Sequence, residues 1–558
     1  MRLTTFLALF FFPASVLAVS SPVVAKQSMV VSEQQLASQA GLDILKAGGN
    51  AIDAAVAVGY ALAVVNPCCG NIGGGGFMTI HLANGKNIFL NFREKAPLKA
   101  SATMFLDNKG NIIANKTTEG YLAVAVPGTV LGLDTALKKY GTMKRQQVMK
   151  AAIHLADNGY ALTSYAVKLL NNSFSYFQKQ PNVAAIFLNN TKPYRLGDIL
   201  IQKELGNTLK KIAADGADIF YKGDIASAII NASEKNGGIL SLRDFAQYTV
   251  QELTPIQCSY HGYTIVSAPP PSSGGVTLCE IANILENYSL TKAGYHSAHD
   301  VHFIVEAMRY AFADRNNQLG DPDFVNNPVE KLISKEYAKT IHQKILKDHA
   351  AIDMTPSISI THQSLNTTHY SIVDKNGNAV SVTYTLNSFF GAKVIAGNTG
   401  FFLNNEMDDF ASKPGAVNQF GLLQNMANNI QPGKRPLSSM TPTIILKDKN
   451  IFMVLGSPGG PRIITATLET LLNVINYKMN IQKAVDEPRF HHQWLPDVID
   501  YEPDTFSIGT INHLEEMGYH LKLQKTWGAM EAILLNPIDG ILYGANDSRR
   551  PDGKAIGY

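Results

Sequence analysis

The sequence has few cysteines and lacks the spacings that usually mark a metal site or a redox dithiol. Four cysteines occur in 558 residues, at positions 68, 69, 258 and 279, and neither a C-x-x-C nor an H-E-x-x-H motif is present. So low a count excludes a fold built on a disulfide framework. We interpret the cysteines mainly as small buried apolar residues, and a bridge between Cys258 and Cys279 stays open.

An excess of one charge is also missing. The 48 Lys and Arg residues nearly balance the 45 Asp and Glu residues, and no run of five or six basic residues occurs. This excludes the electrostatic signature of proteins that bind nucleic acids or anionic membranes. Hydrophobic residues make up 46% of the chain and charged residues 17%, which is typical of a well-buried globular enzyme.

No apolar run is long enough to cross a membrane. The N-terminus begins with Met1 and Arg2, continues with a mostly apolar stretch over 3–12, and then has small residues before Ala18 and Ala25. This pattern predicts a signal peptide within residues 1–25, cleaved after position 18 or 25. A retained anchor is the alternative, but no stop-transfer pattern follows. We therefore expect a protein exported to the periplasm or secreted, with no membrane span after maturation.

The first half of the chain is expected to begin with two helices and a glycine-rich turn. Ser32 can cap a helix ending near Lys46, and Asn50 can cap an almost entirely apolar helix over 51–65. The glycine run over 70–76 lacks the G-K-[ST] ending of a phosphate loop and precedes an alternating strand over 78–82. It therefore indicates close backbone packing. Residues 131–344 are mainly helix-like, with a β-type segment over 248–266.

The pattern changes near residue 366. A polar, irregular stretch over 348–366 resembles a linker, and an alternating hairpin over 369–386 follows it, with its turn at 374–378. Further strands are expected over 441–446 and 451–455, and helices over 462–477 and 481–486. Helices therefore flank a central set of β-hairpins. The chain is expected to consist of two parts with their boundary near residue 366.

Thr367 stands where this linker meets the first strand of the hairpin. A threonine hydroxyl is a weak nucleophile, but a free α-amino group on the same residue, with a pKa near 8, can accept its proton. This requires cleavage of the Asn366–Thr367 bond, which the same hydroxyl can attack in the precursor. Threonine is common at strand starts, so position alone does not distinguish this role from a structural one.

The surrounding motifs resemble the γ-glutamyltranspeptidase family of N-terminal-nucleophile hydrolases. The resemblance runs in order from about residue 30 to the C-terminus. Its motifs are Gly48 to Ala55, Phe92 to Pro97, Val126 to Gly128, Pro270 to Gly275, Asn366 to Ser371, Gly377 to Asn387, Leu403 to Phe410, Lys434 to Met440, Gly456 to Gly460 and Pro488 to Trp494.

The resemblance implies catalytic roles for four residues. Thr367 would become a new N-terminus and form a γ-glutamyl ester, and Thr385 on the return strand would hydrogen-bond to it. The backbone N–H groups of Gly459 and Gly460 would stabilise the oxyanion, although a tight turn would also require these glycines. The adjacent His491 and His492 are interpreted as structural, because they lack further ligands at metal-site spacing.

The resemblance also implies a pocket for the glutamyl end of the substrate. Asn387, Glu406 and Asp409 would bind its ammonium group. Arg93, Ser438 and Ser439 would bind its carboxylate, and a structural ion pair is the alternative role for Arg93. Family members carry Glu or Gln at position 406. Phe420 stands in the loop over 413–432, where relatives often have Tyr, so a hydrogen bond from that hydroxyl is missing here.

The expected fold is α+β, a four-layer αββα sandwich formed jointly by a large subunit over 26–366 and a small subunit over 367–558. The resemblance implies an autoprocessing γ-glutamyltransferase that acts on glutathione or other γ-glutamyl compounds, with water, an amino acid or a dipeptide as acceptor. It implies neither a metal nor an organic cofactor. A cephalosporin (glutaryl) acylase and a secreted, non-catalytic binding protein are the alternatives.

Overall fold

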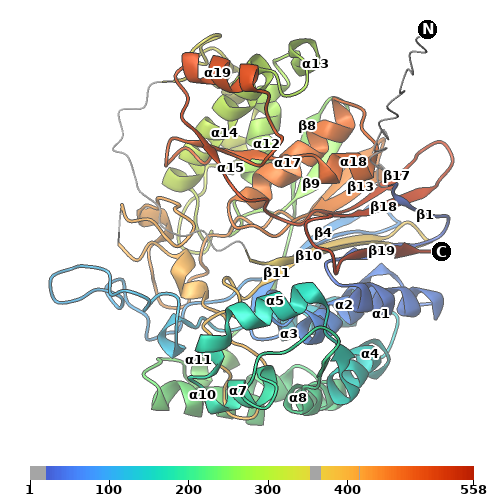
Figure 1. The fold of residues 1–558 in the computed structure, drawn as a ribbon, viewed down its shortest axis with the longest axis vertical. Coiled ribbons are helices and arrows are strands. Elements are labelled where there is room, and N and C mark those ends of the chain that lie inside the picture. The colour runs from blue at the N-terminus through green and yellow to red at the C-terminus, as the bar shows by residue number, and fades with distance from the viewer. Residues whose placement is uncertain (1–20, 352–365, 414) are drawn as a thin grey trace, which may run out of the picture.

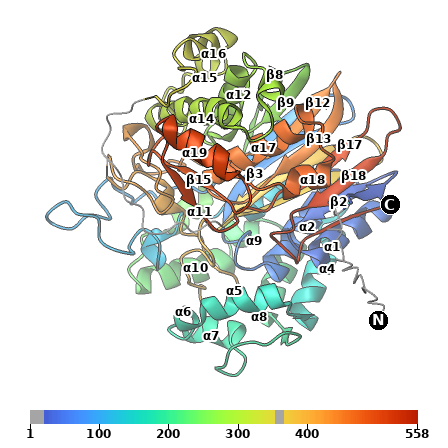
Figure 2. The same ribbon diagram turned by 45° about the horizontal axis from the view of Figure 1, so that its top comes forward.

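The computed structural model describes residues 21–351, 366–413 and 415–558. The expected signal-peptide residues before 21 and the linker residues 352–365 lie outside the described residues. Two seven-stranded sheets lie face to face across the middle of the molecule, and helices cover both outer faces (Figures 1 and 2). The expected four-layer αββα sandwich is therefore confirmed.

The first sheet contains the expected catalytic hairpin at its centre. Its strand order is β19 (Lys554–Gly557), β2 (Met29–Ser32), β10 (Thr368–Val373), β11 (Ala379–Thr385), β3 (Gly75–His81), β4 (Asn87–Phe92) and β7 (Gln251–Leu253). All these neighbours are antiparallel, and Thr368 pairs with Tyr384 across the hairpin. The sheet contains three strands from after residue 366 (β10, β11 and β19) and four from before it (β2, β3, β4 and β7), and the pair β10–β11 lies between β2 and β3, so neither part of the chain can form this sheet alone.

The second sheet is also built from both parts of the chain. Its strand order is β1 (Val23–Ala25), β18 (Leu542–Asn546), β17 (Glu531–Leu535), β13 (Asn450–Gly456), β12 (Thr443–Lys447), β9 (Tyr263–Ser267) and β8 (Ile256–Tyr260). An apolar layer that includes Val31, Val266, Ile444, Val454 and Ile533 fills the space between the sheets. Smaller sheets are formed by β5 (Tyr160–Ala161) with β6 (Ile199–Leu200) and by β14 (Phe490–His491), β15 (Ile499–Tyr501) and β16 (Leu521–Leu523).

One helical layer covers the first sheet, in the lower half of Figure 1. It contains α1 (Gln35–Lys46), α2 (Ala51–Val65), α3 (Thr129–Tyr140), α4 (Arg145–Asn158), α5 (Ser164–Asn172), α6 (Phe174–Phe177), α7 (Pro181–Phe187), α8 (Lys203–Asp215), α9 (Asp218–Tyr221), α10 (Asp224–Lys235) and α11 (Leu242–Ala246). Helix α2 is buried along its whole length against β10 and β11, which explains why it is apolar on every side.

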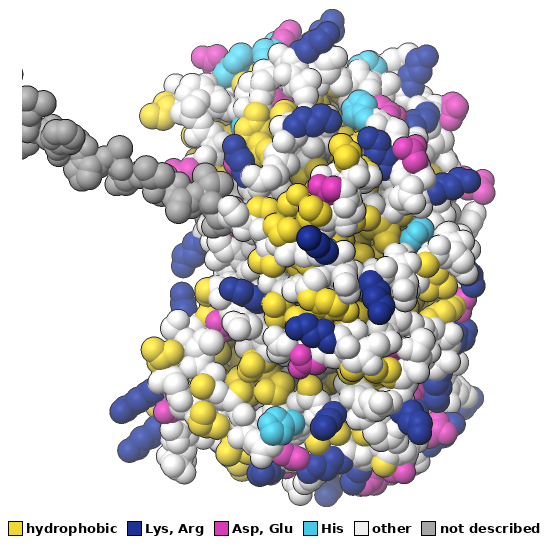
Figure 3. All heavy atoms as spheres, turned by 90° about the vertical axis from the view of Figure 1, so that its right-hand side faces the viewer, with side chains coloured by type: hydrophobic (Ala, Val, Ile, Leu, Met, Phe, Trp, Pro, Cys, Tyr) yellow, Lys and Arg dark blue, Asp and Glu magenta, His cyan; other side chains and the backbone are white. Residues whose placement is uncertain are grey.

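The other helical layer covers the second sheet. It contains α12 (Gly274–Leu285), α13 (Leu290–Ala293), α14 (Ala298–Gln318), α15 (Val329–Leu332), α16 (Lys335–His342), α17 (Arg462–Ile475), α18 (Ile481–Asp486) and α19 (Ile508–Glu516). On the face shown in Figure 3, Lys and Arg side chains are scattered among neutral and acidic ones and do not form one block. Among the described residues, no helix is long and apolar enough to cross a membrane.

Two local expectations need correction. Gln34, not Ser32, caps α1, because Ser32 pairs within the first sheet and its hydroxyl donates to the Gln34 carbonyl. The cysteines are not free buried thiols: the bridge between Cys258 and Cys279, which the sequence analysis left open, is present, and Cys68 is bonded to its neighbour Cys69. The capping of α2 by Asn50 is confirmed, with Asp53 completing a capping box.

Candidate active site

Thr367 lies one residue before β10 and is buried in the uncut chain. Its hydroxyl contacts the carbonyl oxygen of Asn366 and donates to the Thr385 hydroxyl at 3.2 Å. The φ angle of Thr367 is +152°, a conformation that β-branched residues rarely adopt. The hydroxyl is therefore adjacent to the peptide bond that it is predicted to attack, and cleavage of that bond would remove the constraint on φ.

Thr385 is held from the other side by Asn387. The backbone N–H of Asn387 donates to the Thr385 hydroxyl at 2.8 Å, and its side chain donates to the Asn405 carbonyl at 3.1 Å. Asn387 has φ +76°, a left-handed conformation that Asn tolerates better than most residues. This turn lets one residue orient the threonine pair and also face the pocket.

The glycine run packs directly against this turn, as the sequence predicted. A Cβ atom on Gly74 would lie 1.8 Å from the Thr385 carbonyl oxygen, and one on Gly73 would lie 2.1 Å from the Phe402 carbonyl oxygen. Asn404 crosses the same space and donates to the Gly73 carbonyl at 2.9 Å. Only glycine permits so close a contact between these backbones.

Gly459 and Gly460 lie immediately before helix α17, with φ +139° and +58°. Gly460 lines the pocket beside Thr367, whereas Gly459 does not. Among the described residues, neither backbone N–H has a hydrogen-bond acceptor. Two such N–H groups at a helix N-terminus suit a developing negative charge. The ring of Phe420 covers Gly460, so Phe420 closes this side of the pocket.

Arg93 lies one residue after β4 and is fully buried among carboxylates. It donates to Glu406 and, at 2.6 Å, to Asp409, both in the 3₁₀ turn Glu406–Asp409. It also lies 3.5 Å from Glu94 and donates to the Pro436 carbonyl at 3.2 Å. Arg93 thus makes the ion pair that the alternative interpretation required, and it also lines the pocket.

Burial dominates the electrostatics of this cluster. Burial alone would lower the pKa of Arg93, but Glu406, Asp409 and Glu94 raise it above its ordinary value. Burial raises the pKa of Glu406 well above its usual range, and Arg93 offsets only part of this effect. The pKa of Glu94 rises to about 7 for the same reason. The guanidinium of Arg93 therefore counteracts the effect of burial on these acids and favours their charged forms.

Ser438 and Ser439 line the same cavity together with Arg315, a residue that the sequence analysis did not identify. Arg315 projects from α14 and donates to the hydroxyls of Ser439 and Ser273, each at 3.1 Å. Burial, and to a lesser extent the charge of Arg93, lowers the pKa of Arg315 to about 10. It therefore remains protonated at neutral pH and adds a second cation to the site.

Most of the predicted site residues line one cavity, whose empty volume, including space open to solvent, is about 330 Å³. The predicted site residues Asn366 and Gly459 do not line it, although each adjoins a residue that does. Its lining includes Arg93, Thr367, Thr385, Asn387, Glu406, Asp409, Ser438, Ser439 and Gly460.

His491 lies outside the cavity lining. It is buried, and its ring nitrogens form hydrogen bonds with the Thr465 hydroxyl at 3.0 Å and with the side-chain oxygen of Gln493 at 2.9 Å. Within the described parts of the chain, no group of three or more His, Cys, Asp or Glu residues is placed to hold a metal ion.

Known proteins are similar to this chain in sequence and in fold. The family model described as Gamma-glutamyltranspeptidase matches residues 37–558. The glutathione hydrolase proenzyme of Pseudomonas sp. (strain A14) is 53% identical over 97% of this chain and 96% of its own length. That of Escherichia coli (strain K12) is 47% identical over 96% and 93%.

A solved structure supports the same relationship at the level of the fold. The cephalosporin acylase from Bacillus halodurans superposes with a TM-score of 0.85 at 27% identity, and the match covers 99% of both chains. With the family model spanning most of the sequence, the chain belongs to the γ-glutamyltranspeptidase family.

Proposed function

We propose that this protein is an exported, self-cleaving γ-glutamyltransferase that acts on glutathione and related γ-glutamyl compounds. The observation that carries the proposal is the position of the Thr367 hydroxyl. It contacts the Asn366 carbonyl oxygen and Thr385 and lines the same pocket as Arg93, Glu406 and Asp409. One cavity thus contains a nucleophile, next to its scissile bond, and a binding site for an amino acid.

The first reaction is maturation. The Thr367 hydroxyl attacks the carbonyl carbon of Asn366, the C–N bond breaks, and an ester forms between the two residues. Water then hydrolyses the ester and releases a large subunit ending at Asn366 and a small subunit starting at Thr367. Both sheets contain strands from both subunits, so the two remain associated as a heterodimer. A signal-peptide cut after residue 18 would retain strand β1, whereas a cut after 25 would remove it.

The second reaction uses the new N-terminus. The free α-amino group accepts the hydroxyl proton, and the oxygen attacks the γ-carbonyl carbon of the bound substrate. The N–H groups of Gly460 and the adjoining Gly459 would stabilise the oxyanion. The leaving amine departs with a proton, and a γ-glutamyl ester remains on Thr367. Water, an amino acid or a dipeptide then takes the γ-glutamyl group and frees the hydroxyl.

Recognition of the glutamyl end follows from the adjacent charges. The ammonium and carboxylate of the substrate share one carbon atom, so their binding groups must also be adjacent. Arg93 directly contacts Glu406 and Asp409, which fits this requirement. Asn387, Glu406 and Asp409 would bind the ammonium, and Arg93, Ser438 and Ser439 the carboxylate.

The similarity to a cephalosporin acylase makes a glutaryl acylase the second candidate. The test compares turnover of matched γ-glutamyl and glutaryl anilides by the mature protein, by Thr367→Ala and by the hydroxyl-retaining control Thr367→Ser. We expect turnover of the γ-glutamyl compound, no self-cleavage or turnover in the alanine variant, and both at a reduced rate in the serine variant. Preference for the glutaryl anilide would identify an acylase, and self-cleavage of Thr367→Ala would refute the mechanism.

A further inference from the structure

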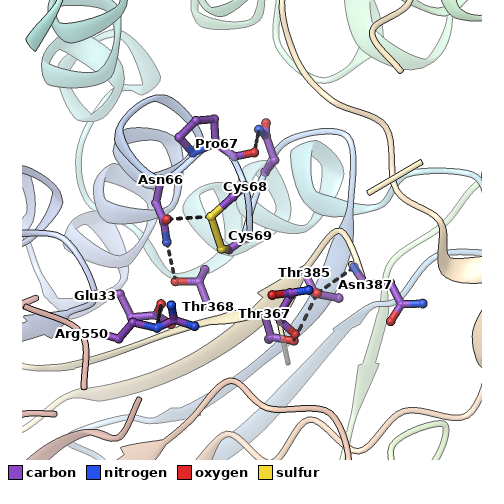
Figure 4. The surroundings of a disulfide bond; sticks show 12 residues. Glu33, Asn66, Pro67, Cys68, Cys69, Thr367, Thr368, Thr385, Asn387 and Arg550 are labelled. Atoms are coloured by element: carbon purple, nitrogen blue, oxygen red, sulfur yellow. Dashed lines mark hydrogen bonds and ion pairs between the residues drawn. A yellow bond between two sulfur atoms is a disulfide. The ribbon is translucent and has the colours of Figure 1, made fainter. Parts of the chain in front are cut away.

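Cys68 and Cys69 form a disulfide between consecutive residues, in the turn between α2 and the glycine run (Figure 4). A bridge between adjacent residues closes a minimal loop, so it restricts the unfolded chain far less than a longer-range bridge does. The other disulfide, Cys258–Cys279, spans 21 positions and joins β8 to α12. The effect of the Cys68–Cys69 disulfide is therefore expected in local geometry rather than in global stability.

Two backbone hydrogen bonds connect this disulfide to the catalytic turn. The Cys69 carbonyl accepts from the Leu386 N–H and the Cys68 carbonyl accepts from the Phe390 N–H, each at 2.8 Å. Leu386 stands between Thr385, the partner of the nucleophile, and Asn387, which orients Thr385. The conformation of the cysteine pair thus determines where the catalytic turn is held.

A second connection runs through side chains to the residue after the nucleophile. The Cys68 sulfur lies 3.1 Å from the Asn66 side-chain oxygen, and the Asn66 amide donates to the Thr368 hydroxyl at 3.4 Å (Figure 4). The bonded sulfur carries no proton, whereas a free thiol could donate to Asn66 and change this contact. A Cβ on Gly70 would lie 2.2 Å from Thr368, so the turn has no spare room there.

A separate cavity reaches the Cys68 side of the disulfide, whose two residues are buried, at 2% and 1% exposed. Its empty volume, which includes space open to solvent, is about 450 Å³, and it shares no lining residue with the cavity at Thr367. Its wall includes Cys68 and mostly apolar side chains such as Leu162, Leu170 and Phe390. The half-buried residues Tyr165 and Ala166 of α5 also line it, so it reaches towards the surface.

We propose that the Cys68–Cys69 disulfide is a positioning element of the catalytic turn and a reaction site for low-molecular-weight thiols that enter this second cavity. A thiolate attacks the Cys68 sulfur, the Cys68–Cys69 bond breaks, and the electron pair leaves on the Cys69 sulfur, which takes up a proton. A second thiol attacks the mixed disulfide. In sum, two thiols become one external disulfide, and the protein gains two cysteine thiols. Opening the ring frees the Cys68 and Cys69 carbonyls to move, and Leu386 moves with them.

The proposal rests partly on the proposed function, which brings glutathione and its thiol-containing dipeptide product to the protein. The experiment uses the mature protein, the Cys68→Ser/Cys69→Ser variant and the matched control Cys258→Ser/Cys279→Ser. A phosphine reductant is used first, since it cannot serve as an acceptor. Alkylation and peptide mass analysis identify which disulfide has opened, and kcat and KM are measured with a γ-glutamyl anilide.

We expect reduction to lower kcat at least about tenfold with little change in KM, because a displacement of about 1 Å can cost catalysis about 100-fold. The control variant should respond like the wild type, and reoxidation should restore kcat. The Cys68→Ser/Cys69→Ser variant should have a low kcat that reductant does not change. Glutathione should modify Cys68 in the wild type, and Ala166→Phe, which narrows the cavity, should slow this modification without changing the kcat of the oxidised protein.

Equal kcat values for the Cys68→Ser/Cys69→Ser variant and the wild type would overturn the proposal, as would proven opening of the disulfide with unchanged kcat. The rate of self-cleavage after Asn366 provides a readout that needs no substrate. If the oxidised wild type cleaves itself but turns over no γ-glutamyl anilide, the proposed function fails. The positioning role is then judged by whether loss of the disulfide slows self-cleavage.

Discussion

The guanidinium of Arg93 and the carboxylate of Asp409 form an ion pair at 2.6 Å in the cavity that also contains Thr367. Both groups belong to the proposed amino-acid site, but they would bind opposite charges of the substrate. In the uncut chain they pair with each other, and the guanidinium also contacts Glu406. A substrate that carries both charges on one carbon can replace these contacts without leaving either group unpaired.

Asp409→Asn should distinguish recognition of the substrate ammonium from recognition of its carboxylate. The substitution keeps the size of the side chain but weakens ammonium binding, and a hydrogen bond to a charged group contributes about 1.5–3 kcal/mol. We expect kcat/KM for a γ-glutamyl anilide to fall about 10- to 100-fold relative to the glutaryl anilide, which has no ammonium group. Arg93→Lys should instead lower kcat/KM for both anilides. A parallel loss of both in Asp409→Asn would contradict the assigned roles.

Arg315→Met should reduce substrate affinity. The variant loses the donors to Ser439 and Ser273 and a positive charge next to the proposed carboxylate site. We expect KM to rise about tenfold, equivalent to about 1.4 kcal/mol, with kcat changed less than about twofold. Arg315→Lys retains the charge and should recover part of the affinity. A fall in kcat at constant KM would assign Arg315 to the chemical step instead.

Arg315 also shows where sequence reasoning stops. It stands in a long helix far from the hairpin in sequence, next to Asn316 and without a local motif, so nothing in its neighbourhood indicates a pocket. The other pocket residues, such as Arg93 and Ser439, were predictable only because the family resemblance implies their roles. Their convergence depends on pairing between strands hundreds of residues apart, which periodicity alone cannot predict.

Gly74→Ala should disrupt the catalytic turn. The added Cβ would lie 1.8 Å from the Thr385 carbonyl oxygen, so Thr385 must move. We expect loss of self-cleavage, measured on denaturing gels, and a decrease of at least about 100-fold in any remaining turnover. Gly509→Ala in α19 is the matched control. Its Cβ would make only an ordinary contact, at 3.8 Å from the Ser507 hydroxyl oxygen, and its helical position should leave the stability equal or higher by up to about 1 kcal/mol. Normal maturation of Gly74→Ala would show that the turn tolerates displacement.

The local structure was predictable where one interaction dominates. Asn50 and Asp53 form a complete N-terminal cap within four residues, and the hairpin from His369 to Thr385 has both alternation and a turn signal. The prediction that Ser32 caps the first helix was wrong because strand pairing with distant residues overrode its capping preference. The Cys258–Cys279 bridge stayed open and the Cys68–Cys69 bridge was not predicted, because disulfide formation depends on the distance between side chains in the fold, which residue spacing does not reveal.

Glu33→Gln should change how stability depends on pH. Glu33 accepts from the His369 N–H at 3.1 Å, and burial raises the pKa of its carboxyl from 4.5 to about 7, although Arg550 lowers it in part. The folded state therefore favours the protonated acid. This contribution is complete below pH 4.5 and is lost as the pH rises towards about 7, which amounts to about 3 kcal/mol.

Gln keeps the acceptor for His369 but cannot ionise. The unfolding free energy of the wild type should fall relative to that of Glu33→Gln across this window, and the gap should be constant above it. Glu33→Ala is the control: it removes the acceptor, so its destabilisation should include a part that does not depend on pH. Denaturant unfolding at several pH values measures all three. A wild-type-to-Gln difference that stays flat from pH 4.5 to 8 would mean that Glu33 is already ionised in the folded protein at low pH, with Arg550 outweighing burial.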